Sequence, residues 1–347
     1  MYKTIIRSIL FRINPEIVHN LVTRILKIFS CIPGSSFLLR KKFSCTSPAL
    51  HRKLFGLYFP NPVGMAAGFD KNAEFYNELA DFGFAFVEIG TVTPRPQPGN
   101  EKPRLFRLTK DNALINRMGF NNKGVEYAVN KLRKKHKVII GGNIGKNTDT
   151  QNCSAEEDYE ICFRKLYDFV DYFVVNVSCP NVSNLKELQD KESLSRILKK
   201  IIKVRNEMPV MKSVLLKIAP DLNDNQLDDV IEVVQKEGID GIVATNTSVQ
   251  RDNLLSEDLL IQKLGQGGLS GQPIRKRSTE IIKYIADKTR GKLPIIGVGG
   301  IMNEYDALEK LKAGASLVQI YTGFIYEGPG LIKKINQLIL KEFTDSN

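Results

Sequence analysis

The chain has 347 residues and a net charge of +12, and 42% of its residues are hydrophobic and 25% charged. These proportions exclude a disordered or fibrous chain, and the length allows one large α/β barrel or two ordinary domains. The five cysteines lack paired metal-ligand spacing and there is no HExxH motif, so a reducing compartment and no catalytic metal are expected. The basic charge is compatible with nucleic acid, a membrane surface or anionic ligands.

The first 40 residues predict two short helices with basic flanks. Apolar residues recur there at helical spacing, Asn14-Pro15 separates the two helices, and Pro33-Gly34 ends the second. No apolar run reaches the roughly 18–20 residues that a membrane span needs, and a signal-peptide pattern is absent. Two interpretations stay open for these helices: they lie in a bilayer interface, or they cap the body of the protein.

Beyond about Leu54, short apolar runs alternate with longer amphipathic segments. The expected strands are Val63–Ala67, Ala85–Thr91, Val138–Gly145, Tyr172–Ser178, Val214–Ala219, Gly241–Thr247, Pro294–Gly300 and Ser316–Thr322. The expected helices include Ala155–Phe169, Leu194–Val204, Asp224–Lys236, Arg275–Ala286 and Glu304–Ala313.

This alternation predicts an α/β fold, a closed (β/α)8 TIM barrel over residues 46–347 that follows an N-terminal helical segment at 1–45. A doubly wound open sheet is the alternative, although no GxGxxG motif follows the first strand. The interval from Thr91 to Val138 is too long for one helix, and it contains a candidate strand pair at Leu105–Leu108 and Ala113–Ile115. Together with a shorter excursion from Val249 to Gly268, it is expected to form a lid or a wall of the site.

The most informative six residues are 176–181, with the sequence NVSCPN, at the end of the expected strand at Tyr172–Ser178. Pro180 must end the strand, which leaves the thiol of Cys179 between the carboxamides of Asn176 and Asn181. Barrel enzymes keep their chemistry at this end of a strand. Ser178 lies one residue earlier and is expected to point to the opposite face. Taken alone, the motif is also compatible with a buried, inert cysteine in a turn.

Glycine clusters near the last two strands predict a phosphate site. Gly297–Gly300 and Gly323 follow these strands, and Gly267–Gly271 precedes the seventh. Glycines allow backbone N–H groups to approach an anion, and the loops after strands seven and eight are the usual phosphate site of barrels. A cofactor that carries a phosphate is therefore expected.

The other strand ends carry carboxamides, hydroxyls and ammonium groups that suit a flat heterocycle rich in C=O and N–H edges. This ring suggests flavin mononucleotide (FMN) with a small anionic heterocycle beside it. Lys217 is informative because an unpaired ammonium is costly inside an apolar strand. It would be paired beside N1 and C2=O of a flavin once the reduced ring carries negative charge. The ring consists of Lys71, Thr91, Asn143, Asn176, Lys217, Thr245, Asn246 and Thr247.

These residues resemble the dihydroorotate dehydrogenase family, and within it the quinone-dependent, membrane-associated class. The resemblance runs almost end to end and depends on three long motifs. They are NPVGMAAGFDK at 61–71, EIGTVTPRPQPGN at 88–100 and NRMGFNN at 116–122.

The resemblance implies one non-covalent FMN and three sets of contacts. The implied flavin contacts are Ala67, Gly68, Phe69, Asp70, Lys71, Thr91, Asn143, Asn176, Lys217, Thr245, Gly271, Gly300, Tyr321 and Thr322. The implied dihydroorotate contacts are Lys71, Asn116, Arg117, Met118, Gly119, Phe120, Asn176, Asn181, Asn246 and Thr247. The implied quinone tunnel lies between the N-terminal helices and includes His19, Arg107 and Tyr321.

One residue departs from the class, which has serine where this chain has Cys179, whereas the soluble enzymes have cysteine. The extension from Met1 to Ser44 is absent from the soluble enzymes and favours the quinone-dependent class. The resemblance implies that Cys179 is the general base in the oxidation of dihydroorotate to orotate, and that Lys217 stabilises the reduced flavin. A membrane quinone, the cytoplasmic face of a bacterial cell membrane and either a monomer or a homodimer are expected, without nucleic acid.

Three rival functions remain. One is a soluble dihydroorotate dehydrogenase that uses fumarate or an iron–sulfur partner. The second is a flavin barrel acting on tRNA uridines, and the third is a non-catalytic phosphate-binding barrel with a membrane-docking arm.

Overall fold

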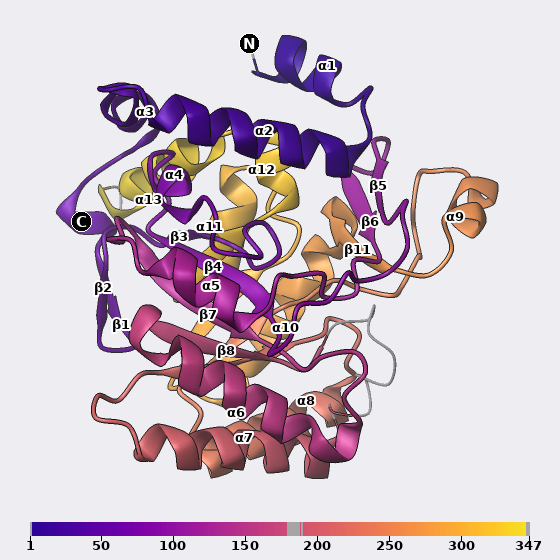
Figure 1. Ribbon diagram of the computed structural model, residues 1–347. Coiled ribbons are helices and arrows are strands. Elements are labelled where there is room, and N and C mark those ends of the chain that lie inside the picture. The colour runs from indigo at the N-terminus through magenta and orange to yellow at the C-terminus, as the bar shows by residue number, and fades with distance from the viewer. Residues whose placement is uncertain (1, 179–187, 189, 345–347) are drawn as a thin grey trace.

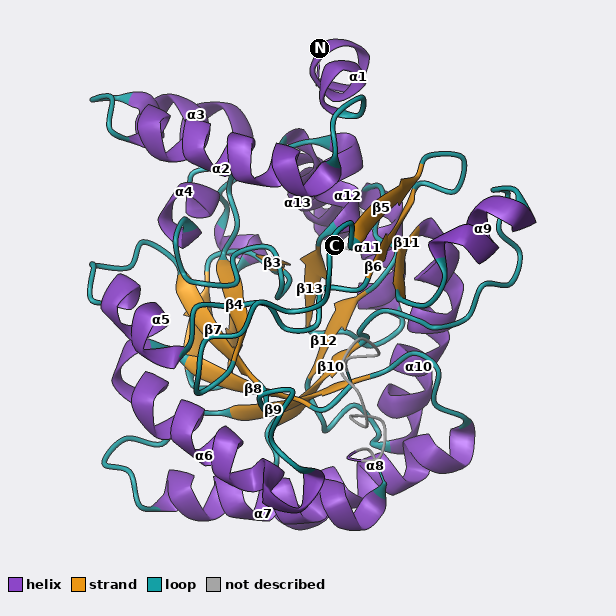
Figure 2. Cartoon of the chain, turned by 45° about the vertical axis from the view of Figure 1, so that its right-hand side comes forward, coloured by secondary structure: helices purple, strands orange, loops and turns teal. Residues whose placement is uncertain are grey.

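The computed structural model describes residues 2–178, 188 and 190–344 (Figure 1). Eight parallel strands close into a barrel in the order β10-β12-β13-β3-β4-β7-β8-β9, which Figure 2 shows as a ring. The predicted TIM barrel and its eight strands are confirmed, with ends that differ by a few residues, and closure excludes the open sheet. The strands are β3 (Val63–Met65), β4 (Phe86–Val92), β7 (Ile139–Ile144), β8 (Tyr172–Asn176), β9 (Val214–Ile218), β10 (Gly241–Ala244), β12 (Ile295–Val298) and β13 (Leu317–Ile320).

Helices cover the outside of the barrel, and the five helices expected from periodicity are all present. Helix α8 begins with a capping box between Asn223 and Gln226, and ends at Gly238 with φ of 70°. Helix α11 begins with a second capping box, between Asn303 and Asp306. The outer helices are α4 (Tyr76–Ala80), α5 (Val125–Leu132), α6 (Ala155–Leu166), α7 (Lys191–Asn206), α8 (Asp224–Glu237), α10 (Arg275–Lys288), α11 (Glu304–Lys312), α12 (Thr322–Glu327) and α13 (Gly330–Thr344).

The barrel strands are buried on both sides, which explains why they read as continuous apolar runs. In β8, Tyr172 and Val174 belong to the cluster inside the barrel, whereas Phe173 and Val175 pack against the outer helices. The other strands alternate in the same way. A hairpin of β1 (Arg52–Leu54) and β2 (Leu57–Phe59) adds Phe59 to the interior cluster.

A small antiparallel sheet lies beside the barrel in the order β11-β6-β5. Its strands β5 (Leu105–Leu108) and β6 (Ala113–Asn116) are the predicted pair, and β11 (Gly268–Gly271) joins them from the second excursion. This third strand was not expected as a strand, because its two glycines give it a low β propensity. Pairing with β6 brings two distant segments of the chain to one side of the barrel.

The N-terminal segment packs across the barrel near α4 and α13 (Figure 1). It contains a π-helical turn η1 (Tyr2–Ile6), α1 (Arg7–Leu10), α2 (Pro15–Ser30) and α3 (Ser35–Phe43). Two helices were expected here, but the structure has a further one, α3, which begins directly after Gly34. A short helix without an apolar stripe gives little periodic signal. The remaining short helices are η2 (Pro48–Leu50), η3 (Asn152–Ser154), η4 (Tyr167–Phe169), α9 (Asp258–Leu264) and η6 (Gln272–Ile274).

Candidate active site

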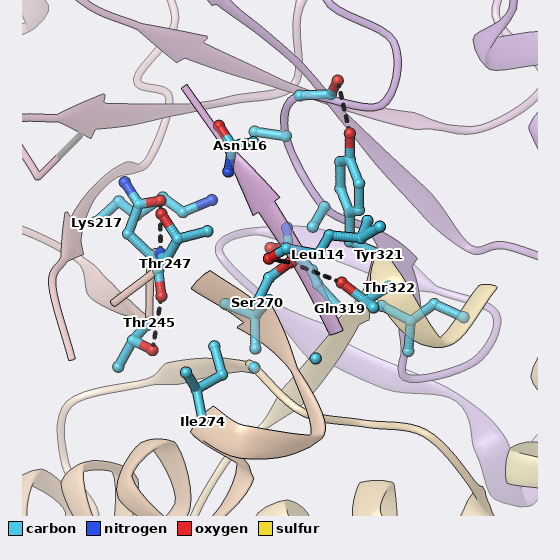
Figure 3. A pocket seen from close by; sticks show the side chains of 18 of the residues that line it. Leu114, Asn116, Lys217, Thr245, Thr247, Ser270, Ile274, Gln319, Tyr321 and Thr322 are labelled. Atoms are coloured by element: carbon cyan, nitrogen blue, oxygen red, sulfur yellow. Dashed lines mark hydrogen bonds between the residues drawn. The ribbon is translucent and has the colours of Figure 1, made fainter. Parts of the chain in front are cut away.

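A cavity opens at the C-terminal ends of the barrel strands, between the barrel mouth and the small sheet (Figure 3). It encloses about 1070 Å³ of space free of protein atoms, part of it open to solvent. The residues implied by the resemblance that line this cavity are Ala67, Gly68, Lys71, Thr91, Asn116, Met118, Phe120, Asn176, Lys217, Thr245, Asn246, Thr247, Gly271, Gly300, Tyr321 and Thr322.

Some of the expected flavin and substrate residues do not line it. Asp70 is buried, and its carboxylate accepts hydrogen bonds from the backbone N–H groups of Glu74 and Phe75, which turns it away from the cavity. Burial raises the pKa of Asp70 to about 7. Arg117 donates to the carbonyl oxygens of Leu264 and Pro103, outside the cavity. The others outside the lining are Phe69, Gly119 and Asn143.

The floor of the cavity is a polar layer inside the barrel, directly above an apolar one. Glu88 follows Phe86 by two residues, Lys217 follows Leu215 and Gln319 follows Leu317, so each polar side chain points to the interior like the apolar one before it. Glu88 is 0% exposed and Lys217 5%. The Glu88 carboxylate accepts from the amides of Asn143 and Gln319, and it lies 3.6 Å from the Lys217 ammonium.

Hydrogen bonds connect this floor to the mouth of the cavity. Asn143 Oδ1 accepts from the Thr91 hydroxyl at 2.6 Å and from Asn176 Nδ2 at 3.3 Å. Asn176 Oδ1 faces the other way and accepts from Asn246 Nδ2 at 3.3 Å. Asn143 therefore lies one layer below the cavity and holds residues that line it.

Ser178 does not point away from the site, contrary to expectation. Its hydroxyl donates to Asn176 Oδ1 at 3.2 Å and accepts from Asn246 Nδ2 at 3.0 Å, and the residue is 3% exposed. Strand β8 ends at Asn176, so the alternation used for the expectation does not reach Cys179. Cys179 and Asn181 lie outside the described residues.

The other end of the cavity is lined by glycine backbone and hydroxyl groups. Gly271 has φ of +99° and Gly300 has φ of +71°, a region that favours glycine. A Cβ at Gly300 would approach Arg275 Cα to 2.4 Å, so a larger residue would displace the loop. The hydroxyls of Ser270 and Thr322 lie 2.8 Å apart at this end (Figure 3).

Of the three expected quinone residues, only Tyr321 lines the cavity. Its ring lies 5.4 Å from Phe69, which in turn lies 5.1 Å from the His19 ring on α2. Burial lowers the pKa of His19 to about 4, so the imidazole is neutral near pH 7. Arg107 donates to the carbonyl oxygens of Phe11 and Ile13 and thereby holds the N-terminal segment. His19 and Arg107 are thus placed around the cavity wall and not in it.

Comparison with known proteins identifies the family. The sequence model described as dihydroorotate dehydrogenase matches residues 49–343. The chain belongs to this family. A dihydroorotate dehydrogenase (quinone) of Christiangramia forsetii is 56% identical over 342 residues, covering 99% of each chain. That of Kineococcus radiotolerans is 45% identical and covers 96% of this chain and 93% of the relative.

Solved structures agree with the sequence comparison. Ligand-free DHODH from Eimeria tenella superposes with a TM-score of 0.83 at 35% identity, covering 96% of each chain. The same protein in complex with ferulenol gives 0.82 at 36% identity, covering 96% of this chain and 92% of the other. These relatives place the chain in the quinone-dependent class of dihydroorotate dehydrogenases, which are oxidoreductases.

Dihydroorotate dehydrogenases are flavin-dependent, and the cavity has the features that such a group requires. Its glycine- and hydroxyl-lined end offers backbone and side-chain donors to an anion. Thr91, Asn176 and Gln319 line the cavity with hydroxyl and amide groups, which can pair with the N–H and C=O edges of a heterocycle. Ile274 and Val298 add apolar surface for a ring.

Two polar residues at the floor of this candidate site were missed from the sequence. Glu88 and Gln319 lie in the apolar strands β4 and β13, as Lys217 lies in β9. The signal used for Lys217, a polar residue within an apolar run, could have found both. Leu105, Leu114 and Ile274 also line the cavity. Leu105 and Leu114 belong to the strand pair expected in a wall of the site, whereas the apolar side chain of Ile274 carried no signal.

Proposed function

We propose that this protein oxidises (S)-dihydroorotate to orotate in the de novo biosynthesis of UMP, with one non-covalent FMN and a membrane quinone as the final acceptor. One observation supports this most strongly. A single cavity combines a glycine- and hydroxyl-lined end with a ring of carboxamides and two ammonium groups. The first suits a phosphate, and the second suits a flat, anionic heterocycle beside a flavin ring.

FMN, when bound, supplies the hydride acceptor and afterwards the electrons for the quinone. Gly271, Gly300 and the Thr322 hydroxyl would hold its phosphate, since backbone N–H groups and hydroxyls are good donors to anions. Lys217 would lie against the ring, where its ammonium stabilises negative charge. Thr91 and Asn176, fixed by their mutual hydrogen bond of 2.9 Å, would orient the ring edge.

The substrate would be held by charge and by amide pairing. Lys71 lines the cavity and donates to Asn121 Oδ1 at 2.8 Å, which holds its ammonium at the rim where the substrate carboxylate would bind. Asn116, Asn176 and Asn246 would pair with the C=O and N–H groups of the substrate ring. Orientation by several polar contacts of this kind lowers the entropic part of the barrier.

Cys179 is proposed as the base that removes the C5 proton of the substrate. It follows Ser178, whose hydroxyl is bonded to Asn176 and Asn246. A free thiol has a pKa near 8.5 and is mostly protonated at neutral pH, so the bound substrate and its surroundings must favour the thiolate. Phe120 and Met118 line the same cavity and would exclude water from the reaction.

Quinone access is proposed through the N-terminal arm, residues 1–45, which we separate from the catalytic barrel, 46–347. Helix α2 exposes an apolar stripe at the spacing of one helical face, namely Ile17, Leu21, Ile25 and Ile28. No single described helix is long and apolar enough to cross a membrane, although α2 and α3, bent by 115°, pass that test as a pair. Such a stripe with basic flanks fits a peripheral position on the cytoplasmic face of the cell membrane.

An acceptor screen on purified protein tests the proposal. We expect a yellow protein with one FMN per chain that is reduced by dihydroorotate and reoxidised by ubiquinone or menaquinone analogues. Rapid reoxidation by fumarate or NAD instead of quinone would assign the chain to another electron route. A protein that stays colourless after incubation with FMN would exclude the flavin chemistry itself.

A further inference from the structure

The floor of the cavity contains a carboxylate to which neither the sequence motifs nor the proposed mechanism assigns a role. Glu88 is completely buried inside the barrel, above Phe86 and below the cavity, and does not line the cavity itself. A buried carboxylate is tolerated only where charge and hydrogen bonds compensate its lost hydration. Its partners are therefore informative.

Three donors surround the Glu88 carboxylate. Oε1 accepts from Asn143 Nδ2 at 2.7 Å, and Oε2 accepts from Gln319 Nε2 at 2.6 Å. Lys217 Nζ lies 3.6 Å from Oε1. Every one of these partners is a donor, so a proton on the carboxyl group would face one of them without an acceptor. The arrangement matches the ionised form, which accepts only.

Lys217 consequently has a counter-charge before any ligand binds. It lines the cavity on one side and meets Glu88 on the other. A positive charge beside a flavin ring favours the reduced form, which is the more negative one. A fixed negative charge behind that ammonium opposes this effect, and burial keeps the interaction strong because water does not screen it.

We propose that Glu88 is a positioning residue that holds Lys217 and lowers the reduction potential of the bound flavin. Removing the carboxylate charge would leave the ammonium of Lys217 uncompensated and make reduction easier. This inference depends on the proposed function, since it requires a flavin above Lys217. Beyond that function, the proposal states that the reduction potential of the flavin depends on a residue that contacts neither flavin nor substrate.

The test is the two-electron reduction potential of the FMN-loaded protein, measured against redox dyes of known potential. In Glu88→Gln, the ratio of reduced to oxidised flavin at a fixed potential is expected to rise at least about tenfold, a shift of about +30 mV for a two-electron couple. Glu88→Asp retains the charge and is expected to change the ratio by less than about threefold. An unchanged potential in Glu88→Gln would overturn the proposal.

Asp81→Asn is the matched control. Asp81 is also a buried carboxylate with an ion pair, to Arg40 at 2.7 Å, but it lies at the end of α4 and not under the cavity. Its variant is expected to keep the wild-type potential. A shift as large as that of Glu88→Gln would show that the potential responds to any lost buried charge, which contradicts a specific role for Glu88.

Folding of the variants is also decisive. Glu88→Gln leaves the buried ammonium of Lys217 without its counter-charge, which can prevent folding of this variant. In that case the double variant Glu88→Gln/Lys217→Met is used, which removes both charges and is expected to fold. With Lys217→Met as reference, the added Glu88→Gln change is expected to shift the potential in the same positive direction. A double variant that also fails to fold, or one whose reduction potential equals that of Lys217→Met, would limit Glu88 to a structural role.

Wild-type protein that binds no flavin would refute the proposed function instead.

Discussion

At the scale of single residues, hydrogen-bond direction is determined layer by layer from the floor of the barrel. Asn143 presents its amide nitrogen to Glu88 and its oxygen to Thr91 and Asn176, which is the direction that suits a carboxylate below it. Asn176 in turn presents its oxygen toward Ser178. Amide side chains have no preferred direction of their own, so the carboxylate at the floor favours one pattern of donors and acceptors in the layers above it.

The proposed base can be tested at this scale with two variants of Cys179. Cys179→Ala is expected to retain FMN and orotate but to reduce its flavin about 10²–10⁴-fold more slowly. Cys179→Ser should keep part of the activity, with an optimum at higher pH, because an alcohol loses its proton less readily than a thiol. The rate of flavin reduction by dihydroorotate, followed by stopped flow, measures both effects.

Ser178→Ala is the neighbouring comparison. It removes two hydrogen bonds within the site, so we expect a loss of about tenfold, larger than strand alternation alone predicts. A collapse of flavin reduction in Ser178→Ala together with near-normal reduction in Cys179→Ala would assign the base to Ser178.

The lowered pKa of His19 predicts that the free energy of unfolding depends on pH. Its pKa is lowered from 6.5 to about 4, chiefly by burial, so between these values the unfolded chain binds more protons than the folded one. Stability is therefore expected to fall as pH decreases from about 6.5 to about 4. In His19→Gln the part of this decrease in unfolding free energy that is due to His19, at least about 1 kcal/mol, should disappear. Urea unfolding at pH 7 and pH 4.5 measures the difference, and parallel curves for the two proteins would contradict it.

At the scale of elements, α2 is fixed to the body at both ends while its apolar stripe stays exposed. Glu16 pairs with Arg104 at 2.8 Å near its start, and Lys27 pairs with Glu74 at 3.2 Å near its end. The Glu16–Arg104 pair is largely buried, whereas the more exposed Lys27–Glu74 pair contributes little stability, about 0–1 kcal/mol. Both pairs orient the helix. The opposite face brings His19 to Phe69, at the edge of the cavity.

Deletion of residues 1–43 tests the arm as a unit. Quinone reduction is expected to be lost, whereas flavin reduction by dihydroorotate should stay within about threefold, because the arm supplies no residue that lines the cavity. Equal quinone turnover in the shortened protein would show that the arm only packs on the barrel.

The double variant Ile25→Glu/Ile28→Glu is a milder version of the same test. It should reduce binding to anionic vesicles more than about tenfold, because charged groups replace the apolar surface that we propose enters the bilayer interface. Ile161→Glu, at an exposed apolar position on α6, is the matched control and should bind like the wild type.

At the scale of the whole molecule, the hairpin β1–β2 contributes to the barrel core although its two strands are not part of the barrel sheet. Phe59 is completely buried, and its ring lies 5.4 Å from Phe86, in the interior cluster that supports the polar floor. Phe59→Ala is expected to cost about 3–5 kcal/mol of unfolding free energy. Tyr58→Ala, at a position 51% exposed, should cost under about 1 kcal/mol. Similar losses for the two variants in denaturant unfolding would show that Phe59 is not part of the core.

The sequence by itself determined the barrel and most of the cavity lining. Apolar runs of strand length report burial on both faces, and residues at the strand ends, such as Lys71, Thr91 and Asn246, were found because parallel strands end at one edge. Long motifs identified the family. These features depend on local order along the chain, which a sequence displays directly.

Only the tertiary structure decided which polar residues meet and which way they face. The pairing of β11 with β6, the position of Glu88 under Lys217 and the turn of Ser178 toward Asn246 all join segments far apart in sequence or lie beyond a strand end. Periodicity applies only within an element, and a carboxylate alone does not indicate its partners. Those partners are set by closure of the barrel, which stacks side chains from different strands into the same layer.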